Sequence, residues 1–192
     1  LNVREMIALD PAAATALWGD LLSRDLVGEV RARLRPVDDP LLYLLADIRR
    51  ARTQLVDGLW IRLVDVGRAL AQRQYARAVD VVIDVTDELL PQNAGRWRLQ
   101  ASPAQASPAQ ASTAQASTAQ ASPAQARASC DRTSASADVV LPVQSLGAAY
   151  LGGTGLGALA RAGLATEARP GALAELSAAM SWDPPPWSPM IF

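Results

Sequence analysis

The sequence contains no histidine and no lysine, and it has one cysteine, Cys130. Without histidine the chain cannot build the Ser-His and Cys-His pairs of common nucleophilic enzymes, a histidine-bearing metal site, or the usual general base of neutral pH. One cysteine cannot form an internal disulfide, so we favour a partly buried spectator thiol over a reactive one at Cys130. Any proton transfer must therefore rest on carboxylates, tyrosine or a chain terminus.

Strong net charge and long hydrophobic runs are also missing. Over 192 residues, 18 arginines nearly balance 19 acidic residues, so there is no net field to attract nucleic acid or anionic lipid. No run of 18 apolar residues could span a membrane, and the first ten residues lack the pattern of a signal peptide. We therefore expect a cytoplasmic protein with no nucleic-acid partner. The chain begins with Leu1, for which a fragment and a non-standard start codon are alternative explanations.

Local patterns predict short helices and strands in mixed order. Asp10 before Pro11 is a typical helix start, and residues 79–86, rich in β-branched side chains, are the strongest predicted strand. The expected helices cover residues 11–23, 40–52, 66–75, 146–151, 156–162 and 172–180. The expected strands cover residues 2–9, 26–35, 58–63, 79–86, 96–99, 127–133 and 137–143.

One segment has a composition that no packed element uses. Residues 101–125 are five pentapeptides, ASPAQ, ASPAQ, ASTAQ, ASTAQ and ASPAQ, without charge and without a large apolar side chain. Such a segment cannot bury enough surface to offset the entropy lost on ordering. We expect a disordered insert at residues 101–126 that joins two strands of a hairpin.

Several acidic and glycine-containing patterns have both a structural and a functional interpretation. Asp38 and Asp39 are better explained as a helix cap than as an acid/base pair. Asp80 and Asp84 share one face of the predicted strand, which favours a solvated face over paired catalytic carboxylates. Residues 155–160 fit GxGxxA but follow a helix, so we favour a turn over a dinucleotide site.

The last twelve residues, 181–192, concentrate stiff and aromatic side chains. They hold two of the five tryptophans, four of the 13 prolines and the free carboxylate. Buried indoles remove much apolar surface from water, and prolines lower the entropy lost on ordering. We expect this tail to dock within the molecule, with recognition of its PxxP pattern, residues 186–189, as the alternative.

Four blocks of the sequence resemble one known family. RPVDDPL at 35–41, DGLWIRLVDV at 57–66, LGAAYLGG at 146–153 and SWDP at 181–184, with Phe192 at the end, are similar to the enhanced intracellular survival (Eis) family of actinobacterial N-acetyltransferases. The resemblance implies an α+β fold in which a partial GNAT-like α/β segment, residues 1–54, precedes a sterol-carrier-like domain, residues 55–192. That domain has a mixed or antiparallel sheet with helices packed on one face.

The resemblance also implies a function. It indicates the C-terminal portion of an acetyl-CoA-dependent N-acetyltransferase whose substrate is an amine such as lysine or an aminoglycoside, and it leaves open a homo-oligomer. The acetyl-CoA-binding domain, which also carries the general-acid tyrosine, has no counterpart here. Residues 144–149 fit the family's CoA-pyrophosphate pattern, but the predicted helix behind them is too short. We therefore expect no cofactor-binding residue, no metal site and no activity of the isolated chain.

The resemblance assigns its site residues to the tail. In such enzymes the C-terminal carboxylate acts as general base, which matches Phe192, and Trp182, Trp187 and Ile191 are the expected substrate-binding residues. A terminal carboxylate is a weak base until desolvation raises its pKa. The chain departs from the family in the missing domain, in the repeat, and in Met190 and Ile191 where an acidic residue would help. The alternative function is a non-enzymatic sterol-carrier-like module that binds an apolar ligand.

Overall fold

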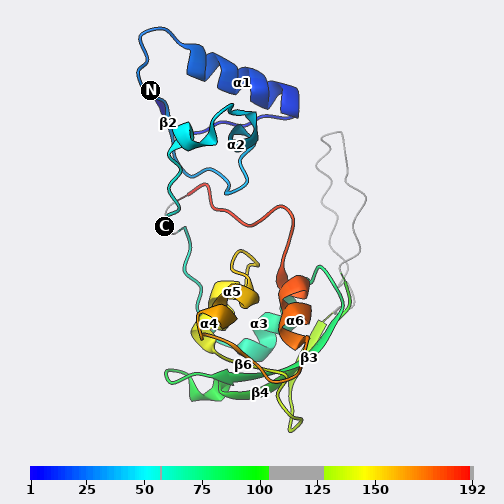
Figure 1. Cartoon of the computed structure of the whole chain (residues 1–192). Helices are drawn as coiled ribbons and strands as arrows, with labels where there is room; N and C mark the ends of the chain where they lie inside the picture. Colours follow the sequence, from blue (N-terminus) through cyan, green and yellow to red (C-terminus); the bar gives the residue numbers. More distant parts are fainter. Residues whose placement is uncertain (57, 104–127, 191–192) are drawn as a thin grey trace, which may run out of the picture. The chain divides into compact units, whose positions relative to one another are not determined.

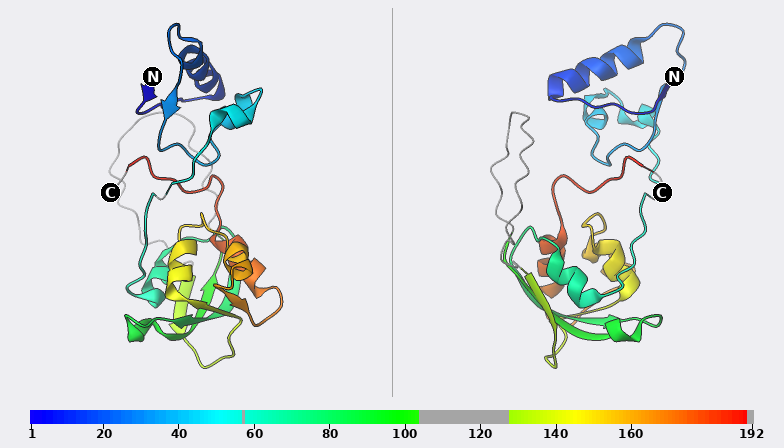
Figure 2. Two further views of the ribbon diagram at one scale, coloured as in Figure 1. Left: turned by 60° about the vertical axis from the view of Figure 1, so that its left-hand side comes forward. Right: turned by 180° about the vertical axis from the view of Figure 1, so that it is seen from behind.

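The structure is a computed structural model that describes residues 1–56, 58–103 and 128–190. It divides into two compact units (Figures 1 and 2). The first unit comprises Leu1–Leu59 and the tail from Pro184, and the second unit comprises Trp60–Asp183. Nearly all of the predicted insert lies outside the described residues, so its predicted disorder stays a prediction.

The first unit contains few regular elements. The helix α1 (Pro11–Ser23) begins as predicted, because the Asp10 carboxylate accepts a hydrogen bond of 2.8 Å from the backbone N–H of Ala13. The other elements are β1 (Asn2–Val3), β2 (Arg31–Ala32), α2 (Leu41–Leu44) and the 3-10 helix η1 (Ile48–Ala51). β1 and β2 pair in parallel.

Three predictions for this unit were wrong in extent. The predicted strand 26–35 is reduced to Arg31–Ala32, because Leu26 and Leu34 have left-handed backbone φ angles of 60° and 53° that interrupt an extended chain. The predicted helix 40–52 is broken after Leu44, and Asp47 starts a separate 3-10 turn. The predicted strand 2–9 is only Asn2–Val3.

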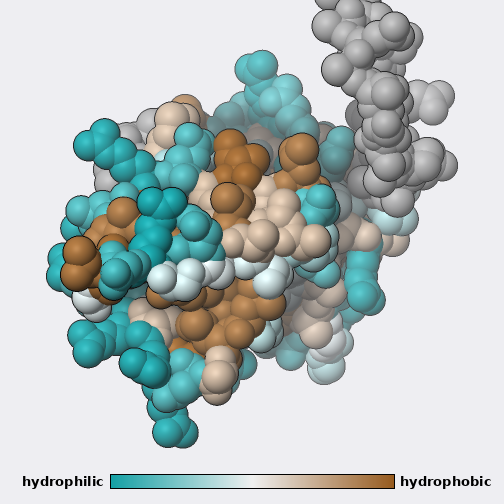
Figure 3. Space-filling view, turned by 90° about the horizontal axis from the view of Figure 1, so that it is seen from above, coloured by the Kyte–Doolittle hydropathy of each residue, from teal (hydrophilic) through white to brown (hydrophobic). Residues whose placement is uncertain are grey.

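The first unit has very little hydrophobic core. Among its described residues the only buried hydrophobic side chains are Ala14 and Trp18 of α1, whereas Leu17 and Leu22 of the same helix are 39% and 50% exposed. Leu26 is almost fully exposed. Figure 3, which looks down on this unit, shows hydrophobic side chains at the surface between hydrophilic ones. A segment of this length is too short to enclose a hydrophobic core of its own, which agrees with the small number of buried side chains.

The second unit is a mixed sheet with helices on one face (Figures 1 and 2). The strand order is β5-β4-β3-β6-β7, in which β3 and β6 are parallel and the other neighbours are antiparallel. The predicted α+β class is thereby confirmed. The strands are β3 (Val79–Thr86), β4 (Gly95–Ala101), β5 (Ala128–Arg132), β6 (Val139–Pro142) and β7 (Thr166–Glu167). The helices are α3 (Val66–Gln72), α4 (Val143–Ala149), α5 (Leu156–Arg161), α6 (Ala172–Met180) and the 3-10 turn η2 (Pro91–Asn93).

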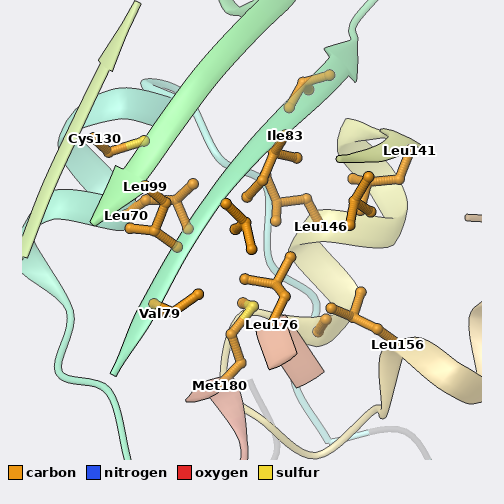
Figure 4. Close-up of a cluster of buried hydrophobic side chains, with 14 of the residues drawn as sticks. Leu70, Val79, Ile83, Leu99, Cys130, Leu141, Leu146, Leu156, Leu176 and Met180 are labelled. Atoms are coloured by element: carbon orange, nitrogen blue, oxygen red, sulfur yellow. The ribbon is translucent and has the colours of Figure 1, made fainter. Parts of the chain in front are cut away.

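Alternate residues of β3 form the centre of the core. Val81 and Ile83 are fully buried and face the helices, because successive side chains of a strand point to opposite faces. Figure 4 shows Leu70 of α3, Leu146 of α4 and Leu176 of α6 pointing into the same cluster. The four helices are therefore held on one face of the sheet by apolar burial, which stabilises each of these side chains by about 1.5–3 kcal/mol.

The opposite face of β3 carries paired charges. Asp80 forms an ion pair of 2.8 Å with Arg98 of β4, and Asp84 lies 3.6 Å from Arg96. The hydrogen bonds from Arg98 lower the pKa of the Asp80 carboxyl to about 2. These carboxylates are therefore neutralised by cross-strand arginines on a partly exposed face, as the solvated-face interpretation predicts.

Sequence patterns predicted most helices and strands of this unit, but they were wrong for the segment before α3 and missed the edge strand β7. β4 and β5, on either side of the insert, pair as the predicted hairpin. The predicted strand 58–63 was wrong: β3 already has β4 and β6 as neighbours, and this segment packs elsewhere. Its Ile61 carbonyl oxygen lies so near Gly147 of α4 that a Cβ there would be 2.6 Å away. The two-residue strand β7 was not predicted.

A buried polar network connects this irregular segment to the sheet. The Asn93 side-chain amide donates to the Asp87 carboxylate (3.0 Å) and to the Leu63 carbonyl (3.2 Å), and its oxygen accepts from the Val66 N–H at the start of α3 (3.1 Å). Asp87 also pairs with Arg62 at 2.5 Å. The Asn93 side chain is buried, and both its amide nitrogen and its amide oxygen form hydrogen bonds within the protein.

Asn93→Ala should be strongly destabilising, since it leaves the buried Val66 N–H without a partner and removes one of the hydrogen bonds to the Asp87 carboxylate. We expect a loss of about 2–3 kcal/mol in the free energy of unfolding, measured by urea denaturation. Gln92→Ala, one residue earlier and without side-chain hydrogen bonds among the described residues, is the matched control. A loss below 0.5 kcal/mol, taken as roughly the level of a surface substitution, would contradict the role of Asn93.

The Asp87 carboxylate should make stability depend on acid pH. Burial opposes ionisation of Asp87, but hydrogen bonds from Asn93, the Leu90 N–H and Arg62 outweigh it and lower the pKa of the carboxyl to about 2. Its contribution is therefore complete above the ordinary pKa near ~3.9 and is lost as the pH falls toward 2. We expect Asp87→Asn to be less stable than the wild type at pH 7, with a gap that narrows between pH 4 and pH 2. A gap that stays constant over that range would contradict this.

Candidate functional site

The tail leaves the second unit from the end of α6, the predicted helix that begins after Gly171. Leu176, Ala179 and Met180 are fully buried, so the last turn of α6 is fixed on the core. The helix ends where Ser181 turns extended, and both its N–H (3.1 Å) and its hydroxyl (2.7 Å) donate to the Ser177 carbonyl. The start of the tail is therefore well defined by the sequence of α6.

Distant parts of the chain converge on this helix end. The Ala76 N–H donates to the Ala179 carbonyl (2.9 Å), and Nη2 of Arg73 donates to the Met180 carbonyl (2.9 Å). Gly152 lies against the same turn with φ +87°, and a Cβ there would collide with the Met180 carbonyl oxygen. Neither Gly152 nor Arg73 was among the predicted site residues, because both act through contacts made far along the chain.

The predicted substrate-binding tryptophans are only half-buried. Trp182 is 39% exposed and belongs to the second unit, whereas Trp187 is 46% exposed and belongs to the first. Ile191 and Phe192 lie outside the described residues. The catalytic role of Phe192 and the binding roles of Trp182, Trp187 and Ile191 therefore stay predictions.

Residues 184–190 of the tail belong to the same compact unit as the first 59 residues. Within that unit a Cβ at Gly58 would lie 3.8 Å from the Ser188 side chain. The hydroxyl of Ser188 donates to the Met190 carbonyl (2.8 Å) and closes a local turn. This association agrees with the predicted intramolecular docking of the tail.

Asp39 is a structural residue in the first unit. Its carboxylate pairs with Arg35 at 2.6 Å and accepts from the Leu41 N–H at 2.8 Å, at the start of α2. Arg35 in turn donates to the Met6 carbonyl and stacks over Trp18. Both Asp39 oxygens are thus engaged, which favours the cap over an acid/base pair.

The remaining sequence patterns are explained by packing. Residues 144–149 lie inside α4, whose Gly147 is required by the close approach of the Ile61 carbonyl rather than by a bound anion. Gly155 precedes α5, as a turn would require. Burial raises the pKa of the Cys130 thiol to about 12, as expected for a spectator cysteine.

The described residues contain a hollow but no metal cluster. An open hollow of about 590 Å³ lies beside the start of β3, the end of β4 and the start of β5, and polar side chains such as Asp80, Gln100 and Glu175 contribute to its lining. No group of three or more Cys, Asp or Glu side chains in the described ranges could hold a metal ion. None of the helices formed by these residues is long and apolar enough to cross a membrane.

Comparison with known families assigns both units. Residues 66–189 match the sterol carrier protein domain, which covers more than half of the chain, and residues 1–63 match an acetyltransferase (GNAT) domain. Along the chain, a segment matching a GNAT domain is therefore followed by a mixed sheet with helices on one face that matches a sterol carrier protein domain.

Relatives with the same two parts are named N-acetyltransferases. An uncharacterised N-acetyltransferase of Streptomyces coelicolor is 44% identical over 98% of this chain and 40% of its own length, and the N-acetyltransferase Eis of Mycobacterium tuberculosis is 31% identical over 96% and 40%. Among solved structures, Eis1 from Mycobacterium abscessus matches with a TM-score of 0.72 at 34% identity, over 100% of this chain and 43% of that one. The chain belongs to the Eis-like GNAT family of N-acetyltransferases and spans about two fifths of the length of the curated relatives it matches.

The glycines near the tail provide a stability test. Gly152→Ala should lower the free energy of unfolding by about 2 kcal/mol or more, because the positive φ is strained for alanine and its Cβ meets the Met180 carbonyl. Gly157→Ala, inside α5 and without such a clash, should raise it by up to about 1 kcal/mol. Equal effects of the two substitutions in urea denaturation would show that the approach of Gly152 to α6 is unimportant.

Proposed function

We propose that these residues form the C-terminal portion of an acetyl-CoA-dependent N-acetyltransferase whose acceptor is an amine. The observation that carries the proposal is the match of nearly the whole chain to Eis-like N-acetyltransferases, together with a tail that starts at a fixed helix end. The substrate class is a primary amine such as a lysine side chain or an aminoglycoside. The domain division proposed is a GNAT-like segment over 1–54 and a sterol-carrier-like domain over 55–192.

The chemical role proposed for this chain is proton removal by the carboxylate of Phe192. Transfer of an acetyl group to an amine requires that the ammonium first lose a proton, and a sequence without histidine offers few bases for that step. Desolvation raises the pKa of a terminal carboxylate and so makes it a better base. Trp182, Trp187 and Ile191 would surround the amine and exclude water from it.

The acetyl-CoA site is proposed to lie outside these 192 residues. Bound acetyl-CoA supplies the acetyl group, and its pyrophosphate is normally held by free backbone amides at a helix start. The candidate pattern for that purpose, residues 144–149, lies within α4, where the Ile61 carbonyl oxygen packs closely against Gly147. The described residues therefore do not fit acetyl-CoA, and binding of this cofactor is not part of the role proposed for this chain.

The chain alone should therefore be inactive. We expect purified residues 1–192 to give no acetyl transfer above background with acetyl-CoA and a panel of amines, measured by release of free CoA thiol. A joined protein, in which residues 1–192 replace the corresponding C-terminal part of the Streptomyces coelicolor relative, should restore transfer. Turnover by residues 1–192 alone would refute the proposed location of the acetyl-CoA site.

The role of the tail predicts how changes at Phe192 affect the joined protein. Deletion of Phe192 shifts the carboxylate and should lower kcat by about 100-fold or more, which is the size of a typical general-base contribution. Phe192→Leu keeps a carboxylate at the same position and should retain kcat within about tenfold, since a general base acts through its carboxylate. If the deletion has no larger effect than Phe192→Leu, the carboxylate is not the base.

A sterol-carrier-like module that binds an apolar ligand is the alternative function. No specific observation favours it. The space between sheet and helices is filled by buried side chains (Figure 4), and the hollow beside β5 has a partly polar lining. Apolar ligands require an apolar cavity, so a fluorescent fatty-acid displacement assay should give no binding.

A further inference from the structure

The guanidinium of Arg73 occupies an unusual place at the root of the tail. Arg73 lies just after α3, 107 residues before Met180, yet Nη2 of Arg73 donates to the Met180 carbonyl at 2.9 Å. That carbonyl is in the last turn of α6, where backbone acceptors have no partner within the helix. A cation at this end of a helix also interacts favourably with the helix dipole.

Two tyrosines hold the guanidinium in place. Its carbon lies 4.7 Å from the ring centre of Tyr75 and 5.5 Å from that of Tyr150, which are distances of cation–π contacts. Both rings are themselves fixed, because the Tyr75 hydroxyl donates to the Leu70 carbonyl (2.7 Å) and the Tyr150 hydroxyl donates to the Ala69 carbonyl (3.0 Å). Both acceptors belong to α3, so α3, the two rings and the guanidinium form one continuous support for the end of α6.

The burial of the Arg73 guanidinium costs free energy, and packing of the core alone does not explain why a charged side chain lies here. Nη1 of Arg73 is buried and has no hydrogen-bond partner among the described residues. Burial lowers the pKa of the Arg73 guanidinium, against the opposing influence of Tyr75 and Tyr150. An apolar side chain in this position would avoid the burial of a charge, but it could not bond the Met180 carbonyl.

We propose that Arg73 is the positioning residue of the C-terminal tail. Its bond to Met180 fixes the direction in which Ser181 and Trp182 leave α6. The importance of this direction for acetyl transfer rests on the proposed function, in which the tail carries the general base. The anchoring itself does not depend on catalysis and can be measured in residues 1–192.

Hydrogen exchange of backbone amides tests the anchoring directly. In Arg73→Met, which keeps the apolar stem but removes the donor, we expect the Ser181 amide, which donates to the Ser177 carbonyl, to exchange about tenfold faster, the size expected for loss of a hydrogen bond from a charged donor. Amides of β3 and β4 should be unchanged. Arg77→Met is the matched control, because Arg77 is an exposed arginine in the same segment without ion pairs among the described residues. No change at Ser181, or an equal change throughout the sheet, would overturn the proposal.

Two further variants and measurements separate positioning from stability. Arg73→Lys keeps the charge but cannot stack a flat group on two rings, so it should recover less than half of the lost protection; full recovery would overturn the role of stacking. In the joined protein, Arg73→Met should lower kcat about tenfold with KM for acetyl-CoA unchanged. If the wild-type joined protein transfers no acetyl group, the proposed function fails while the exchange result still decides whether Arg73 anchors the tail.

Discussion

The burial of α6 against the five-stranded sheet is the interaction on which the rest of this structure depends. Leu176, Ala179 and Met180 are fully enclosed, and their removal from water fixes both the position and the end of the helix. The packing of α6 therefore sets the position from which the tail starts. Chain termini ordinarily fray. This tail starts beside the Met180 carbonyl, which accepts a hydrogen bond from Arg73 and lies close to Gly152.

The two units of the chain differ in how they are stabilised. The second unit has a continuous hydrophobic core and a buried polar network around Asn93, which together determine one arrangement of its sheet and helices. The first unit relies on a few contacts around Trp18, Arg35 and Asp39 and leaves many apolar side chains exposed. Residues 1–63, which include this segment, match an acetyltransferase (GNAT) domain.

Sequence patterns predicted the elements whose signals are local. Asp10 caps its helix at the expected residue, and β3 has the predicted limits because it is rich in β-branched residues. Strand 26–35 failed because left-handed leucines are not recognisable from their type, and strand 58–63 failed because an alternating pattern does not say whether a sheet edge is free. Of the candidate site, the residues of the tail could be proposed from composition and resemblance. Arg73 could not, because its role comes from a contact 107 residues away.

The chemical role proposed for this chain is that of a carboxylate at the end of the tail. The most direct test is to prepare the joined protein with a C-terminal carboxamide at Phe192, which removes the charge and leaves every side chain in place, and to measure kcat against pH. If the carboxylate is the general base, kcat at pH 7 should fall by about 100-fold or more, because a neutral amide cannot accept the proton of the amine. Unchanged kcat in the amidated protein would contradict it.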